Sequence, residues 1–218
     1  MLKIRHYIYN LLVDKGISDD TAKFLNMLGL LLAVLLIAFI VDFITKRILW
    51  RFSAGVAKRT KTNFDDILIT NRLPRNIAHI VPLIILIEFV PQVFSDYPYA
   101  ENIIEKTLKI IAIVLALQII RSFLNSIKDY LKTLKRYKDK PVDSYIQVFM
   151  IFAWLLGLFS ALAIITGVSF IKFATTLGAA SAVIILIFKD TILGFVASIQ
   201  VSINDMVRIG DWITFDKY

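Results

Sequence analysis

The sequence has no cysteine, only two histidines and few charged side chains for its length of 218 residues. The absence of cysteine excludes disulfides, thiolate catalysis and thiolate metal sites. His6 and His79 lie far apart in the chain, which also excludes a histidine-rich metal cluster. Charged residues make up 19% of the chain and hydrophobic residues 58%, whereas soluble domains have about a quarter charged residues. The excess of apolar surface predicts a membrane protein.

Several function classes are disfavoured by what the sequence does not contain. It has no nucleophile and base pair, no phosphate-binding loop and no metal-ligand set, so we expect neither enzymatic activity nor a cofactor. The net charge of +8 would indicate nucleic-acid binding if the basic residues formed a solvated face. They lie instead between long apolar runs, so we expect no nucleic-acid partner.

Five stretches approach the roughly 20 apolar residues that a transmembrane helix needs. They are residues 24–44, 77–94, 103–124 and 145–166, and a fifth that begins near Phe170. We therefore expect an all-α membrane protein with five transmembrane helices per subunit. Residues 1–23 are polar and amphipathic and lack a small-residue cleavage site, so they are not interpreted as a signal peptide. Pro82 and Pro91 predict a kink in the second span.

Lysine and arginine are concentrated in two loops, residues 45–76 and 121–144, whereas the loop after the second span is acidic. Because basic loops are retained in the cytoplasm, this pattern predicts an outside N-terminus and a cytoplasmic C-terminus. The basic loops are interpreted either as topology signals alone or also as binding sites for anionic lipids, which contribute about 1 kcal/mol per basic residue near the surface.

The last apolar segment, Phe170 to Asn204, contains no proline and is too long for one straight span. A helix of about 35 residues measures roughly 50 Å, which exceeds the bilayer. The adjacent charges Lys189 and Asp190, followed by Gly194, predict a break at that point. We expect the half before the break to cross the membrane and the half after it to lie at the interface.

Small residues gather before the predicted break, and in lipid they allow helices to approach closely. They are Ala174, Thr175, Thr176, Gly178, Ala179, Ala180, Ser181 and Ala182. One interpretation is ordinary packing within a subunit, in which Gly178, Ala180 and Ser181 contact neighbouring helices. The other is self-association around a lumen, lined by the stripe Thr175, Ala179, Ala182 and Leu186. A ring of Leu186 side chains would then form an apolar constriction that gates by dewetting.

The segment Leu177 to Ile213, LGAASAVIILIFKDTILGFVASIQVSINDMVRIGDWI, resembles the pore helix and following linker of the small-conductance mechanosensitive channel family. The five-span layout and the Asn204-Asp205-Met206 turn are similar to its miniconductance branch. The resemblance implies a homoheptamer in the bacterial inner membrane, with other copies of the chain and membrane lipids as partners. Its function would be an ion channel that opens under tension and releases ions and small osmolytes during hypo-osmotic stress.

The resemblance also assigns roles to residues and segments. The family's two pore-sealing leucines fall on Ala182 and Leu186, and its kink dipeptide falls on Lys189-Asp190. Gly210-Asp211 matches the turn into a cytoplasmic β-domain. Residues 24–166 would form a lipid-facing sensor paddle, residues 167–204 the pore helix, and residues 205–218 the start of the β-domain, so that the chain is a fragment of a longer protein.

Two alternatives stay open at this point. A secondary transporter or a non-conducting scaffold would use intramembrane acids, for which Glu88 and Asp42 are the candidates. Lys46 lies one helical turn after Asp42, however, so an ion pair is the expected role of Asp42. Lys189 and Asp190 are expected either to form ion pairs between subunits or to contribute to ion selectivity.

Overall fold

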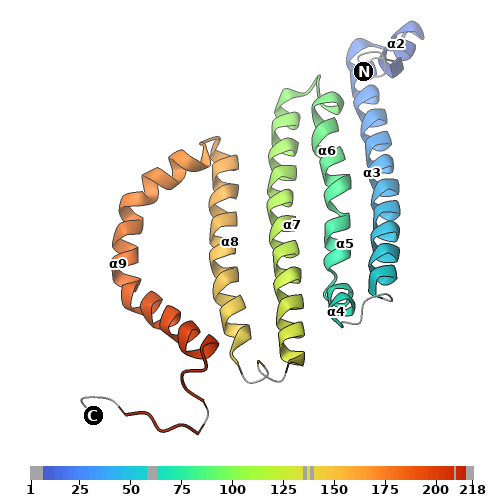
Figure 1. Ribbon diagram of the computed structural model, residues 1–218. Coiled ribbons are helices and arrows are strands. Elements are labelled where there is room, and N and C mark those ends of the chain that lie inside the picture. Colours follow the sequence, from blue (N-terminus) through green and yellow to red (C-terminus); the bar gives the residue numbers. More distant parts are fainter. Residues whose placement is uncertain (1–6, 58–62, 135–136, 138–139, 209, 215–218) are drawn as a thin grey trace. The chain divides into compact units, whose positions relative to one another are not determined.

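The computed structural model describes residues 7–57, 63–134, 137, 140–208 and 210–214 (Figure 1). Within these residues every regular element is an α-helix, as the sequence predicts. The chain divides into two units, Met1–Gly167 and Val168–Tyr218, and each is described by itself. The left-handed backbone of Gly167 (φ 72°) ends the last helix of the first unit.

Five helical segments in the described residues are long and apolar enough to cross a membrane, which confirms the expected multi-pass architecture. They are Asp19–Gly55, Leu73–Val93, Pro98–Thr133, Val142–Thr166 and Ser181–Ile203. The predicted spans 24–44, 103–124 and 145–166 lie inside these helices, and 77–94 ends one residue beyond its helix. The helices are longer than the predicted spans because Lys, Arg and Leu continue a helix into water at little cost.

The first unit is a row of helices. Its elements are α2 (Tyr7–Asp14), α3 (Asp19–Ala57), α4 (Phe64–Thr70), α5 (Leu73–Ala78), α6 (Ile80–Val93), α7 (Pro98–Thr133) and α8 (Val142–Thr166). In space α3 packs against α6, α6 against α7, and α7 against α8 (Figure 1). A row of this kind leaves its two broad faces uncovered, and the large apolar side chains on them remain exposed.

The small core of this unit lies where α6 is enclosed by its two neighbours. Val90, Val93 and Phe94 are buried there. Partly buried residues pack around them from α3 (Met27, Leu30, Leu31, Val34) and from the start of α7 (Ala100, Ile104, Leu108). The opposite end of the row, drawn at the bottom of Figure 1, carries α4, α5 and the C-terminal ends of α3 and α7; we call it the basic end.

The second predicted span is interrupted at His79, between α5 and α6, rather than at either proline. Proline has no N–H and therefore cannot bond to the carbonyl four residues before it. For Pro82 that carbonyl belongs to Ala78, the last residue of α5. The missing hydrogen bond therefore explains why the helix is interrupted directly after Ala78, three residues before the proline itself. Pro91 remains inside α6.

A polar contact ties the N-terminal helix α2 to the start of α3. The Tyr9 hydroxyl donates a hydrogen bond to the Asp19 carboxylate at 2.5 Å, and Lys23 pairs with the same carboxylate at 2.6 Å. Because the protonated hydroxyl is the donor, this bond raises the pKa of Tyr9 above its ordinary value. The predicted segment 1–23 thus contains a short helix anchored at the first span.

In the described residues of the second unit there is one helix, α9 (Phe170–Ile203), which begins at the N-cap Ser169. The expected break at Lys189-Asp190 is wrong as an interruption, since the helix continues through both residues and through Gly194. Figure 1 shows instead a helix that curves along its length. Charged side chains leave the backbone hydrogen bonds intact and a single glycine costs only about 1 kcal/mol, so neither signal stops a helix.

The expected β-domain begins with a strand, but residues 205–208 and 210–214 contain turns and irregular backbone without a strand. Residues 209 and 215–218 lie outside the described part of the chain. The assignment of 205–218 to such a domain therefore stays a prediction.

Gly157 provides a test of the packing between α7 and α8. A Cβ atom at this position would lie 2.7 Å from Leu117 Cδ1 and 3.3 Å from Ile113 Cγ2, and Leu117 is itself buried. We expect Gly157→Ala to lower the melting temperature, because overpacking costs about 1–3 kcal/mol and exceeds the gain in helix propensity. Thermal unfolding of the purified protein in detergent, followed by circular dichroism, measures the effect.

Gly55→Ala is the matched control, since a Cβ atom at Gly55 meets nothing within 4 Å. It gains the same helix propensity without the clash, so its melting temperature should be unchanged or higher. Equal melting temperatures for the two variants would contradict close packing at Gly157.

Candidate functional site

The predicted pore stripe lies on one face of α9. Since the helix is continuous, residues spaced by four, three and four positions stay within one narrow sector. Thr175 and Ala182 are exposed, and Leu186 is 73% exposed. The side chain of Ala179 lies outside the described part of the structure. The Thr175 hydroxyl donates to the Ile171 carbonyl at 2.8 Å, so the polar group on this stripe is already bonded to its own helix.

The residues expected to pack against neighbouring helices are also found on α9. Gly178 is exposed, and a Cβ atom at this position would meet nothing within 4 Å. Ser181 is half-buried, and the side chain of Ala180 is outside the described part. The open space beside Gly178 leaves room for a second helix, whether from this chain or from another copy.

Lys189 and Asp190 project from α9 and are both exposed. Neither side chain forms an ion pair or a hydrogen bond with another described residue. Successive residues on a helix do not face each other, so the two charges cannot satisfy one another within one chain. Gly194, one turn later, is exposed and has open space around it.

A turn follows α9 at the position where the resemblance places the linker. Gly210 has a left-handed backbone (φ 104°), which favours glycine. The Asp211 carboxylate accepts a hydrogen bond from the Arg208 backbone N–H at 2.8 Å, and the Asp211 N–H donates to the Arg208 carbonyl at 3.0 Å. These bonds close a turn, and its role as the entry to a β-domain stays a prediction.

The first two candidate spans are joined by a polar cluster at the basic end. Lys46 Nζ lies 2.5 Å from Asp42 Oδ2, which confirms the predicted ion pair. His79 Nδ1 lies 2.9 Å from the other carboxylate oxygen, a contact that sequence reasoning missed. The sequence does contain a signal for this contact. Asp42 lies near the end of one span and His79 near the start of the next, and in antiparallel neighbouring helices these two positions lie at the same depth in the membrane.

The two intramembrane acids are not brought into one site. Asp42 contacts His79, whereas Glu88 lies nine residues after His79, or roughly 13 Å along the helix axis. Glu88 is exposed, and its side chain forms no hydrogen bond or ion pair with another described residue. A transporter site built from both acids has no support in this arrangement.

The Asp42–Lys46 pair can be tested with a double-mutant cycle using Asp42→Asn and Lys46→Gln. The Asp42 side chain is only 20% exposed. We expect a coupling free energy of about 1 kcal/mol, at the upper end for ion pairs near a surface, because water screens this pair less. Thermal or denaturant unfolding in detergent measures the four variants.

Asp19 and Lys23 form the matched control on the same helix, with the same spacing and a 57% exposed carboxylate side chain. Their coupling should be about 0.3–0.5 kcal/mol. A coupling at Asp42 and Lys46 that does not exceed the control would show that the lower exposure of Asp42 adds nothing to the strength of this ion pair.

No protein-family model matches the chain, and no solved structure matches it. The resemblance to the small-conductance mechanosensitive channels therefore rests on the sequence of residues 177–213 and on the five-span layout. Self-association, channel activity and the pore role of α9 are proposals, argued below from the chain's own residues.

Proposed function

We propose that copies of this chain assemble into an ion channel that membrane tension opens, with α9 lining the pore. The observation that most supports this proposal is the exposure of the fifth candidate span. The apolar stretch of this span, which lies within Ser181–Ile203, has no buried residue. In the apolar stretches of the other four candidate spans, 11–28% of the residues are buried. An apolar helix that carries small residues on one face and unpaired charges needs partners, and further copies of α9 provide them.

The chemistry of the stripe suits a gate that excludes water. Leu186 is the one large side chain on a stripe whose other members are Thr175, Ala179 and Ala182, so a ring of Leu186 is the narrowest point of the proposed lumen. Thr175 bonds to its own helix and offers its hydroxyl less readily to pore water. An apolar constriction of this kind closes by dewetting.

Tension does work in proportion to the membrane area that a protein gains, so it favours the state of larger area. The row α3, α6, α7 and α8 offers two broad apolar faces to lipid, and its tilt would change the area occupied. Within α9 we assign residues 170–188 to the pore wall and 191–203 to the interface. The division concerns their roles, because the helix itself is continuous.

The rest of the proposal follows from the sequence pattern. The basic end faces the cytoplasm of a bacterial inner membrane, the N-terminus lies outside, and opening releases ions and small osmolytes under hypo-osmotic stress. A heptamer is the assembly that the resemblance implies.

One specific observation favours the alternative functions, a secondary transporter or a non-conducting scaffold. Glu88 is an exposed acid within a candidate span and has no partner among the described residues. Such a group is by default a functional candidate. Its separation from Asp42 argues against a two-acid transport site, so Glu88 is the next residue to test if the chain conducts no current.

Leu186→Ser tests the proposed gate. A hydroxyl in place of each leucine removes up to about 2 kcal/mol of apolar burial per subunit from the closed constriction and lets water enter. We expect currents at a lower threshold tension, measured by patch-clamp recording of the chain in liposomes under stepped suction.

Ile187→Ser is the matched control, because Ile187 is 69% exposed against 73% for Leu186 and points away from the stripe. It should leave the threshold nearly unchanged. Silence of the unchanged protein at every tension, with insertion verified, would overturn the channel proposal. Equal effects of the two substitutions would overturn only the gate assignment.

Lys189 and Asp190 test self-association. Since each charge is costly without a partner, we expect pairing between subunits, so that Lys189→Asp alone lowers the fraction of oligomer. Exchanging both residues (Lys189→Asp with Asp190→Lys) should restore it, as measured by mass photometry in detergent. If the oligomer is unaffected while the reversal potential of the current shifts, the charges act in ion selectivity instead.

A further inference from the structure

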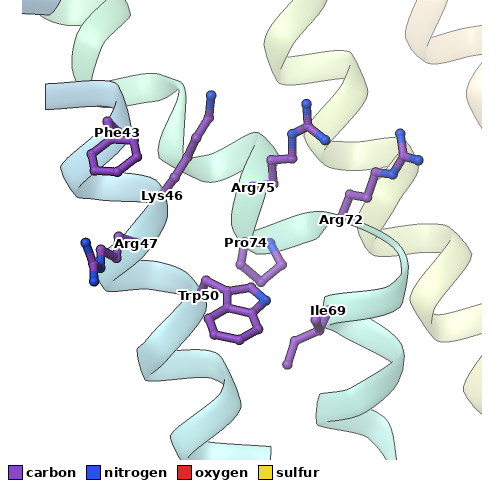
Figure 2. Close-up of a pocket in the computed structure, with 8 residues that line it drawn as sticks. All are labelled: Phe43, Lys46, Arg47, Trp50, Ile69, Arg72, Pro74 and Arg75. Carbon is purple, nitrogen blue, oxygen red and sulfur yellow. The ribbon is translucent and has the colours of Figure 1, made fainter. Parts of the chain in front are cut away.

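A groove with a volume of about 520 Å³ lies at the basic end of the first unit, between α3 and the segment formed by α4 and α5 (Figure 2). It is lined by Phe43, Lys46, Arg47 and Trp50 on one side and by Ile69, Arg72, Pro74 and Arg75 on the other. In Figure 2 Trp50, Pro74 and Ile69 lie across the middle, and the basic side chains spread around them. The groove has an apolar floor and a cationic rim, and none of these lining residues is acidic.

Most of the positive charge on this rim is uncompensated. Lys46 is paired with Asp42. The side chains of Arg47, Arg72 and Arg75 form no ion pair or hydrogen bond with another described residue. Like charges around one groove repel each other, and an anion placed among them relieves that repulsion. Planar guanidinium groups match the oxygens of a phosphate group and can bind it through two parallel hydrogen bonds.

Arg72 has a backbone conformation that arginine seldom adopts, with φ 60° and ψ 19°. This left-handed conformation costs free energy in any residue with a Cβ atom, and it persists only where neighbouring contacts impose it. Two side-chain bonds to α7 hold the segment: Asn71 donates to Asp129 at 2.8 Å, and Asn76 donates to Ser122 at 2.7 Å. A strained arginine on a fixed segment is typical of a residue retained for binding.

The groove also lies where a lipid headgroup is expected. It is placed at the ends of the first two candidate spans, and Trp and Arg are the side chains that favour the boundary between hydrocarbon and water. Phe43 and Trp50 are 59% and 61% exposed, so their rings are available to an acyl chain beside the groove. A free phosphate would use the rim but would leave this apolar floor unfilled.

We propose that this groove is a specific site for one anionic phospholipid. Its phosphate contacts the guanidinium groups of Arg72 and Arg75, with Arg47 adding charge, and an acyl chain covers Phe43 and Trp50. The site goes beyond the proposed channel activity and does not depend on it, since lipid binding by the first unit is measurable whether or not the chain conducts ions.

Quenching of Trp50 fluorescence tests this site. The substitutions Trp154→Phe and Trp212→Phe leave Trp50 as the only tryptophan. The protein is placed in phosphatidylcholine vesicles in which a fraction of either phosphatidylglycerol or phosphatidylcholine carries brominated acyl chains. We expect brominated phosphatidylglycerol to quench Trp50 at a several-fold lower mole fraction. Removal of one arginine, in Arg72→Gln or Arg75→Gln, should lower this preference by about fivefold.

Arg51→Gln is the matched control, because Arg51 is an exposed basic residue on α3 that lies outside the groove. It should keep the preference. Arg72→Gly separates binding from folding, since glycine adopts the left-handed backbone without strain. The melting temperature of Arg72→Gly should be unchanged or higher while the preference falls by the same factor.

The proposal is overturned if brominated phosphatidylglycerol and phosphatidylcholine quench Trp50 equally, or if Arg51→Gln lowers the preference as much as Arg72→Gln does. Adding millimolar inorganic phosphate to the detergent-solubilised protein tests the alternative that the rim binds a free anion. A rise in melting temperature with phosphate that disappears in Arg72→Gly would assign the rim to a free anion and would also overturn the lipid site.

Discussion

The architecture depends on one constraint: the chain has far more apolar side chain than it can bury within itself. Hydrophobic residues make up 58% of the sequence, yet among the described residues of the first unit the buried core cluster comprises Val90, Val93 and Phe94. In hydrocarbon an exposed leucine costs nothing, but an unpaired backbone group costs several kcal/mol. Long helices that satisfy every backbone group internally are therefore favoured, and they need not gather into a bundle.

Because lipid provides no hydrophobic force between helices, small and polar side chains determine which helices touch. Gly157 allows α8 to approach Leu117 on α7. Ser122 is buried where Asn76 donates to it from α5, and Asp42 joins α3 to His79. Each boundary within the row thus has its own specific contact, and the large apolar side chains remain on the two broad faces.

The number and type of the spans could be predicted because a stretch of about 20 consecutive apolar residues is rarely found outside a transmembrane helix. Helix ends could not, since Lys46 and Arg47 continue α3 as readily as leucine does. The break expected at Lys189-Asp190 was wrong for the same reason, because those charges leave the backbone intact. The His79–Asp42 contact and the groove beside Trp50 both depend on how antiparallel helices align. The positions of Asp42 and His79 at the ends of successive spans carry a signal for the contact, whereas no local pattern indicates the groove.

The unpaired charges of the described chain differ in a way that indicates different partners. Lys189 and Asp190 carry opposite signs on one helix, so rotated copies of α9 can place the lysine of one against the aspartate of the next. Arg47, Arg72 and Arg75 carry one sign, and a second copy of the same cluster would repel the first. In the proposed assembly the self-complementary pair is satisfied by another copy of the chain, whereas in the proposed lipid site the single-sign groove takes its anion from the membrane surface. Charge pattern therefore separates the surface suited to assembly from the surface suited to lipid, although both belong to one apolar chain.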